Sequence, residues 1–142
     1  MAMPVVTTQS IIGVDVAKDE LVIYCAESDQ LETISNTKAA IKKWLKTVAK
    51  PVAIAIEATN IYHQEFAELA HADGCRIYMV GGYELSHYRK GVNVRAKTDA
   101  LDARLLARYL TNEGDHLRPW TPPSPLYCRL ISLFRRRAAL VQ

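Results

Sequence analysis

The stretch IIGVDVAKDELVIYCA, residues 11–26, decides how this chain folds. It contains two short runs of apolar and β-branched residues, Ile11 to Val16 and Leu21 to Ala26, a pattern typical of buried strands. The polar residues Lys18-Asp19-Glu20 lie between the runs and fit a tight connection, so we expect a hairpin. Asp15 lies near the end of the first run, where a buried charge is costly unless a partner offsets it.

Apolar runs at residues 31–35, 52–56 and 76–80 predict three further strands. Helices are predicted between these strands, and another from Asp99 to about Leu110. Residues 83–96 are mixed and basic, without a clear period. The predicted caps are Asn36 or Thr37 for the first helix, Thr59 or Asn60 for the second, with Tyr62 on its apolar face, and Thr98 for the third.

A hairpin followed by alternating helices and strands predicts an α/β fold in which helices flank a mixed sheet. The ribonuclease-H-like fold has this order of elements. In that fold the first and fourth strands are parallel neighbours. This arrangement would bring Asp15 and Glu57 together at one edge of the sheet.

The composition is that of a globular domain with its own core. The chain has 142 residues, of which 49% are hydrophobic and 23% charged, and its net charge is +3. No Asp or Glu follows Asp115, whereas Arg118, Arg129 and the run from Arg135 to Arg137 do. This basic end favours a polyanion or an acidic helix as partner.

The cysteines and the hydropathy pattern favour a cytoplasmic protein. Cys25, Cys75 and Cys128 are far apart and lack metal-ligand spacing, which indicates reduced thiols. The start has no signal-peptide pattern, and no run approaches transmembrane length. We therefore expect no membrane partner.

A proline-rich stretch at residues 119–125 cannot form a helix or a central strand. We expect a first domain over residues 1–115, a linker over 116–125, and the start of a helical or coiled-coil segment over 126–142. The last apolar pattern runs on without a cap. This predicts that the chain is the front part of a longer protein.

Four acidic residues lie where divalent cations would need them. Asp15 and Glu57 end apolar runs, and Asp99 and Asp102 share the first turn of a predicted helix, where the helix dipole favours carboxylates. Any one of them alone could be a surface or capping acid. Together, carboxylates from several elements can hold two Mg²⁺ or Mn²⁺ ions that stabilise both the attacking and the leaving oxygen of a phosphodiester.

Several segments, taken in order, resemble the DEDD-type insertion-sequence transposases, the family that includes the Piv DNA invertases. The first acidic motif alone is weak, but the set in this order is specific. The segments are Gly13-Val-Asp-Val-Ala-Lys, Glu57-Ala-Thr-Asn-Ile-Tyr, Lys97-Thr-Asp-Ala-Leu-Asp-Ala, Trp120-Thr-Pro and residues 130–137. Many members have glycine where this chain has Asn60, and asparagine tolerates the same left-handed turn.

This resemblance implies a RuvC-like nuclease domain with a C-terminal helical extension. Its catalytic and metal-binding residues would be Asp15, Glu57, Asp99 and Asp102, with Mg²⁺ or Mn²⁺ as cofactor. The function implied is that of a DNA transposase or site-specific recombinase, associated with the nucleoid of a prokaryotic cell. A second domain beyond residue 142 and a guide RNA from the same element are implied as well. The last predicted helix has an apolar face with little to cover it, which favours a dimer or higher homo-oligomer.

Basic and aromatic side chains near the acids are candidate contacts with nucleic acid. Such residues suit a phosphate backbone and stacked bases. Solvated positions in a hairpin and a loop are the alternative interpretation. The candidates are Lys18, Tyr88, Arg89, Lys90, Arg95 and Lys97.

Three other functions fit part of the pattern. A stand-alone RuvC-like Holliday-junction resolvase would use the same acids, and a non-catalytic nucleic-acid-binding module would use only the basic residues. An actin-like or sugar-kinase-like ATPase also begins with a strand, an acid and a hairpin. Its hairpin needs Gly, Ser or Thr around phosphate, and residues 16–20 offer none.

Overall fold

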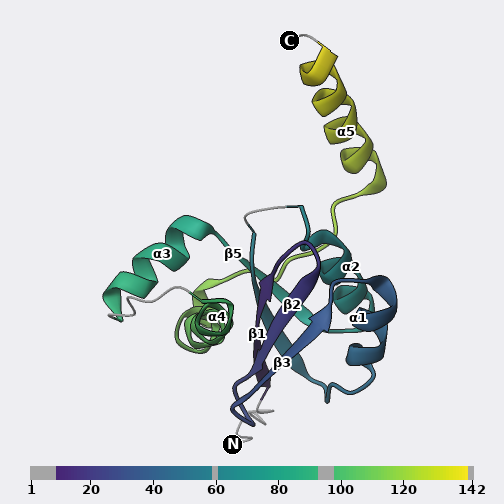
Figure 1. Ribbon diagram of the computed structural model, residues 1–142. Coiled ribbons are helices and arrows are strands. Elements are labelled where there is room, and N and C mark those ends of the chain that lie inside the picture. Colours follow the sequence, from purple (N-terminus) through teal and green to yellow (C-terminus); the bar gives the residue numbers. More distant parts are fainter. Residues whose placement is uncertain (1–8, 59–60, 93–97, 141–142) are drawn as a thin grey trace, which may run out of the picture.

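A computed structural model describes residues 9–58, 61–92 and 98–140 of the chain. Its centre is a mixed sheet of five strands in the order β3-β2-β1-β4-β5 (Figure 1). The strands are β1 (Ser10–Val16), β2 (Glu20–Cys25), β3 (Gln30–Ser35), β4 (Val52–Glu57) and β5 (Arg76–Val80).

The pairing of the strands confirms the predicted hairpin and the predicted parallel neighbours. β1 runs antiparallel to β2 and parallel to β4, and β4 runs parallel to β5. The carboxyl ends of β1, β4 and β5 therefore lie at one edge of the sheet. We call this the carboxyl edge.

Helices cover both faces of the sheet (Figure 1). The helices α1 and α2 lie on one face, and α4 lies on the other with α3 beside it. The bounds are Lys38–Leu45 for α1, Gln64–Ala72 for α2, Gly82–Gly91 for α3, Asp99–Glu113 for α4 and Pro125–Leu140 for α5, with a short 3₁₀ turn at Gly114–His116.

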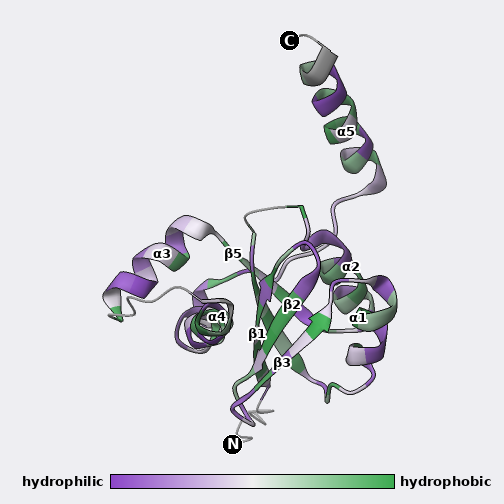
Figure 2. Cartoon of the chain, in the orientation of Figure 1, coloured by the Kyte–Doolittle hydropathy of each residue, from purple (hydrophilic) through white to green (hydrophobic). Residues whose placement is uncertain are grey.

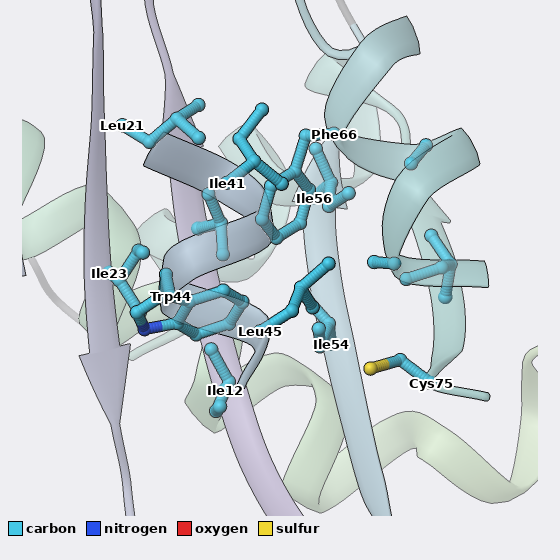
Figure 3. Close-up of a cluster of buried hydrophobic side chains, with 14 of the residues drawn as sticks. Ile12, Leu21, Ile23, Ile41, Trp44, Leu45, Ile54, Ile56, Phe66 and Cys75 are labelled. Carbon is cyan, nitrogen blue, oxygen red and sulfur yellow. The ribbon is translucent and has the colours of Figure 1, made fainter. Parts of the chain in front are cut away.

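The larger core lies between the sheet and the pair α1 and α2. Strand residues such as Ile12 and Ile54 meet Trp44 and Phe66 from these helices, whose rings lie 5.7 Å apart (Figure 3). Each such fully buried side chain contributes about 1.5–3 kcal/mol to stability. Burial also raises the pKa of the Cys75 thiol at this core.

The smaller core lies under α4 and includes Leu105, Leu106 and Leu110. Here the helix backbone approaches the sheet directly. A Cβ atom on Gly13 would lie 1.9 Å from the carbonyl oxygen of Ala103, which no side chain can tolerate. Gly13 therefore sets the distance between β1 and α4.

Two predicted caps are confirmed, and one helix begins later than predicted. The Thr37 hydroxyl accepts a hydrogen bond from the first turn of α1, and Thr98 does the same for α4. The helix α2 begins only at Gln64, so Tyr62 precedes it and is exposed. The predicted caps Thr59 and Asn60 lie outside the described residues.

The expectation of a loosely patterned loop after β5 was wrong, because residues 82–91 form α3. The sequence of α3, GYELSHYRKG, does not show a helical pattern, because Leu85 is the one buried residue among those described in this helix. A single apolar anchor leaves no periodic stripe to recognise.

Part of the proline-rich stretch is attached to the sheet. The Trp120 amide donates a 2.6 Å hydrogen bond to the carbonyl oxygen of Ile77 in β5, and the indole ring meets His71 edge-on. Beyond it, α5 extends away from the sheet (Figure 1) and mixes polar and apolar residues along its length (Figure 2). Its large apolar side chains are exposed, as Leu126 and Phe134 illustrate at 68% and 64%.

None of the helices in the described ranges is long and apolar enough to cross a membrane.

Candidate metal and nucleic-acid site

Two of the predicted acids are neighbours at the carboxyl edge. Val14 in β1 lies opposite Ile56 in β4, so Asp15 and Glu57 are the next residues along the two parallel strands. Because side chains alternate between faces, both acids point away from the core that holds Val14 and Ile56, toward the face that α4 covers. Both are half-buried.

The helix α4 carries the other two acids across the same face. Ala103 lies against Gly13, which is two residues before Asp15 on the same side of β1. Asp102 directly precedes Ala103 and is only 3% exposed. Asp99 is the first residue of α4, and its side chain lies outside the described ones.

The buried carboxylate of Asp102 has a partner on α3. The Nη2 atom of Arg89 forms an ion pair with Oδ1 of Asp102, and the two side chains are 16% and 5% exposed. Beside this pair, Asn112 donates a 2.6 Å hydrogen bond to the Tyr88 hydroxyl, and the Tyr88 ring meets Tyr109 edge-on at 5.1 Å. These contacts hold α3 against α4.

Two carboxylates, those of Glu84 and Glu113, line the same pocket as Tyr109 between α3 and α4. Burial raises the pKa of the Tyr109 phenol, and the carboxylates of Glu113 and Glu84 raise it further.

The predicted nucleic-acid contacts lie in different environments. Lys18 is exposed in the turn between β1 and β2, and Lys90 is exposed on α3. Tyr88 and Arg89 are half-buried and face α4 through the contacts above. Arg95 and Lys97 lie outside the described residues.

Asn36 has a role at the carboxyl edge that the sequence did not reveal. Its side-chain amide donates to the carbonyl oxygens of Ala17 at 2.8 Å and Tyr62 at 3.0 Å. These bonds join the turn that carries Lys18 to the segment that follows Glu57. The sequence signalled Asn36 as a possible helix cap, whereas Thr37 is the cap.

The donor set fits a hard divalent cation in its chemistry. Carboxylate oxygens are the ligands that Mg²⁺ and Mn²⁺ prefer. Asp15 and Glu57 offer two such ligands on neighbouring strands. In the part of the chain with described side chains, no three Asp, Glu, His or Cys residues form a ready-made cation site. Asp102 is bound to Arg89, and the Asp99 side chain lies outside that part.

Solved structures of RuvC share the fold. The structure of Thermus thermophilus RuvC matches with a TM-score of 0.59 and 12% identity, covering 79% of this chain and 100% of RuvC. RuvC of the same organism in complex with a Holliday junction substrate matches with a TM-score of 0.56 and 11% identity, covering 79% of this chain and 99% of that one. The fold is therefore the RuvC-like, ribonuclease-H-like one predicted from the order of elements.

Relatives by sequence are the pilin gene-inverting proteins of Moraxella bovis and Moraxella lacunata. Each is 28% identical over an alignment of 138 residues, and the alignment covers 92% of this chain and 42% of the relative. The chain thus spans less than half the length of these relatives. Residues 12–142 also match the sequence profile of a transposase family. Because that match covers nearly all of the sequence, the chain belongs to the IS110-type DEDD transposase family.

Proposed function

We propose that this chain is the metal-dependent nuclease domain of a DNA transposase or site-specific recombinase. The observation that carries the proposal is the neighbouring pair Asp15 and Glu57 at the carboxyl edge, under a helix that brings Asp102 to the same face. Membership in a transposase family supports the reaction class.

The acids Asp15, Glu57, Asp99 and Asp102 would hold one or two Mg²⁺ or Mn²⁺ ions. Bound divalent cations stabilise the charge that develops on the attacking and leaving oxygens of a phosphodiester. Because Asp15 and Glu57 belong to paired strands, their backbones keep a fixed separation. The positions of Asp99 and Asp102 depend on how α4 packs on the sheet. The distance between these two acids and the acids on the strands can therefore change.

DNA is the proposed substrate and partner. Lys18 stands in an exposed turn at the carboxyl edge, and Lys90 is exposed on the neighbouring helix α3, so both can meet phosphates. Arg95 and Lys97 precede α4 in the sequence and complete the basic set, with Tyr88 and Arg89. A guide RNA would use the same kind of contact.

The whole protein would contain more than this domain. We assign residues 1–115 to the nuclease domain, 116–125 to a linker and 126–142 to a helical segment. The exposed apolar residues of α5 are suited to packing against another copy, so a dimer or higher homo-oligomer is part of the proposal. The Trp120 contact with Ile77 fixes the first part of the linker to the sheet.

A stand-alone resolvase is the less favoured alternative. The likeness to RuvC is at the level of the fold, whereas the family match concerns transposases. Cleavage of a four-way junction by this chain without any added segment would instead favour the resolvase.

The proposal is tested by substituting Asp15 and Glu57 singly, as Asp15→Asn and Glu57→Gln. Because we expect this chain to be inactive alone, the test uses the full-length protein. Each variant should keep its fold by circular dichroism and lose Mg²⁺-dependent recombination by about 100-fold or more, as expected when a charge-stabilising group of a reaction centre is removed. Asp115→Asn, an exposed acid outside the site, is the control and should support normal recombination. Full activity in both site variants would refute the assignment. DNA binding that persists in EDTA, with no metal binding, would indicate a non-catalytic module.

A further inference from the structure

The ion pair between Arg89 and Asp102 joins a predicted metal ligand to a predicted nucleic-acid contact. Asp102 is only 3% exposed, and burying a carboxylate is costly unless a compensating charge lies beside it. Among the described residues, Arg89 makes the ion pair that meets this need. The same carboxylate is one that the proposed function assigns to a divalent cation.

We propose that Arg89 is a positioning residue. Its guanidinium neutralises Asp102 in the metal-free protein and is displaced from this carboxylate when a divalent cation binds. This inference rests on the proposed function, because it requires Asp102 to be a ligand. A guanidinium and a divalent cation on one buried carboxylate repel each other strongly, since little water screens them. The two therefore compete for Asp102.

The structure gives Arg89 a way to leave. Its side chain is 16% exposed, so part of it already reaches solvent. The helix that carries it is anchored by one buried residue, Leu85, and by the hydrogen bond between Tyr88 and Asn112. Because Leu85 is the one buried residue that the structure describes in α3, little apolar packing opposes a shift of the end of this helix.

Displacement would link metal binding to substrate binding. Once released from Asp102, the guanidinium can bind a DNA phosphate at the same site. Arg89 would then pair with Asp102 in the metal-free protein and with a DNA phosphate in the metal-bound protein. The coupling is reciprocal. If the ion pair with Arg89 lowers the affinity of the site for metal by some factor, bound metal lowers the stability of the ion pair by the same factor.

The test is Mn²⁺ binding, followed by electron paramagnetic resonance at constant ionic strength. Arg89→Gln removes the competing charge and should bind Mn²⁺ more tightly by about 5- to 150-fold, the usual range of coupling between two binding events. Arg108→Gln is the matched control, because it removes the same charge from an exposed position on α4. This control should change the affinity little. Equal or weaker Mn²⁺ binding by Arg89→Gln relative to Arg108→Gln would overturn the proposal.

A measurement on the unaltered protein keeps the proposal testable if Arg89→Gln does not fold. The side-chain N–H resonance of Arg89 should report an ion-paired guanidinium without Mg²⁺ and a solvent-exchanging one at saturating Mg²⁺. An unchanged resonance would refute displacement.

The variant Asp15→Asn distinguishes the two proposals. If this variant binds Mn²⁺ as tightly as the original chain, the proposed metal site is refuted. If it binds Mn²⁺ more weakly while Arg89→Gln does not bind it more tightly, only the proposed role of Arg89 is refuted.

Discussion

At the scale of single residues, Gly13 controls how near the candidate acids on α4 can come to those on the strands. It lies between Asp15 and the base of β1, and its missing side chain lets the backbone of α4 touch the strand. The acid Asp102 is adjacent in sequence to that point of contact. The spacing of helix and sheet therefore also determines how near Asp102 comes to the strand acids.

Gly13→Ala should lower stability by about 1–3 kcal/mol, because α4 must move away from β1 to make room. Urea unfolding followed by circular dichroism measures this change. Gly91→Ala is the control, since no atom lies within 4 Å of the added Cβ. We expect that variant to be as stable as the original chain or slightly more so. If Gly13→Ala were equally harmless, the close approach would be wrong.

Residue types alone predicted that Asp15 and Glu57 lie at the ends of buried strands, because each follows an apolar run, and the strand pairing confirms this position. The role of Asn36 and the pairing of Arg89 with Asp102 could not be predicted in this way. Both depend on segments that meet only after the sheet and its helices have packed. Local patterns carry no signal for such contacts.

At the scale of elements, the sequence predicted strands better than helices. Five apolar runs became five strands, and the parallel pairing of β1 with β4 followed from their order. The helix α3 was missed because it buries only Leu85 among its described residues, and the start of α2 was placed too early. A helix held mainly by polar contacts to another helix leaves little periodicity to read.

The start of α4 is a second element-scale feature with a measurable contribution. The Thr98 hydroxyl accepts a 3.2 Å hydrogen bond from the Leu101 amide in the first turn, next to Asp99. Thr98→Ala should cost about 0.5–2 kcal/mol in the free energy of unfolding, and Thr98→Ser should restore most of it. Thr111→Ala on the same helix is the control and should change stability by less than about 0.5 kcal/mol. Equal effects of the two alanine variants would contradict the cap.

At the scale of the whole molecule, the sheet with its helices α1, α2 and α4 is well packed, whereas α5 is not. The helix α5 leaves its large apolar residues exposed, whereas Trp120 is attached to β5 and to His71. The contacts with the sheet therefore extend to Trp120, inside the segment 116–125 that we assign to the linker.

Two truncations test these contacts. A chain that ends at Ser124 lacks only α5 and should unfold within about 0.5 kcal/mol of the original, as expected for loss of exposed residues. A chain that ends at Leu117 also loses Trp120 and should be less stable by about 1–2 kcal/mol, less than the value for a fully buried large side chain because Trp120 is half-buried. Thermal unfolding compares the two. Equal stability would place Trp120 outside the folded unit.

The central claim is that acids from β1, β4 and α4 form one divalent-cation centre. Anomalous diffraction from crystals soaked in Mn²⁺ tests it directly. We expect a Mn²⁺ peak in contact with the carboxylates of Asp15 and Glu57, with Asp102 turned toward it and away from Arg89. Saturating Mn²⁺ with no peak at Asp15 and Glu57, or carboxylates that stay more than about 10 Å apart, would contradict a shared centre.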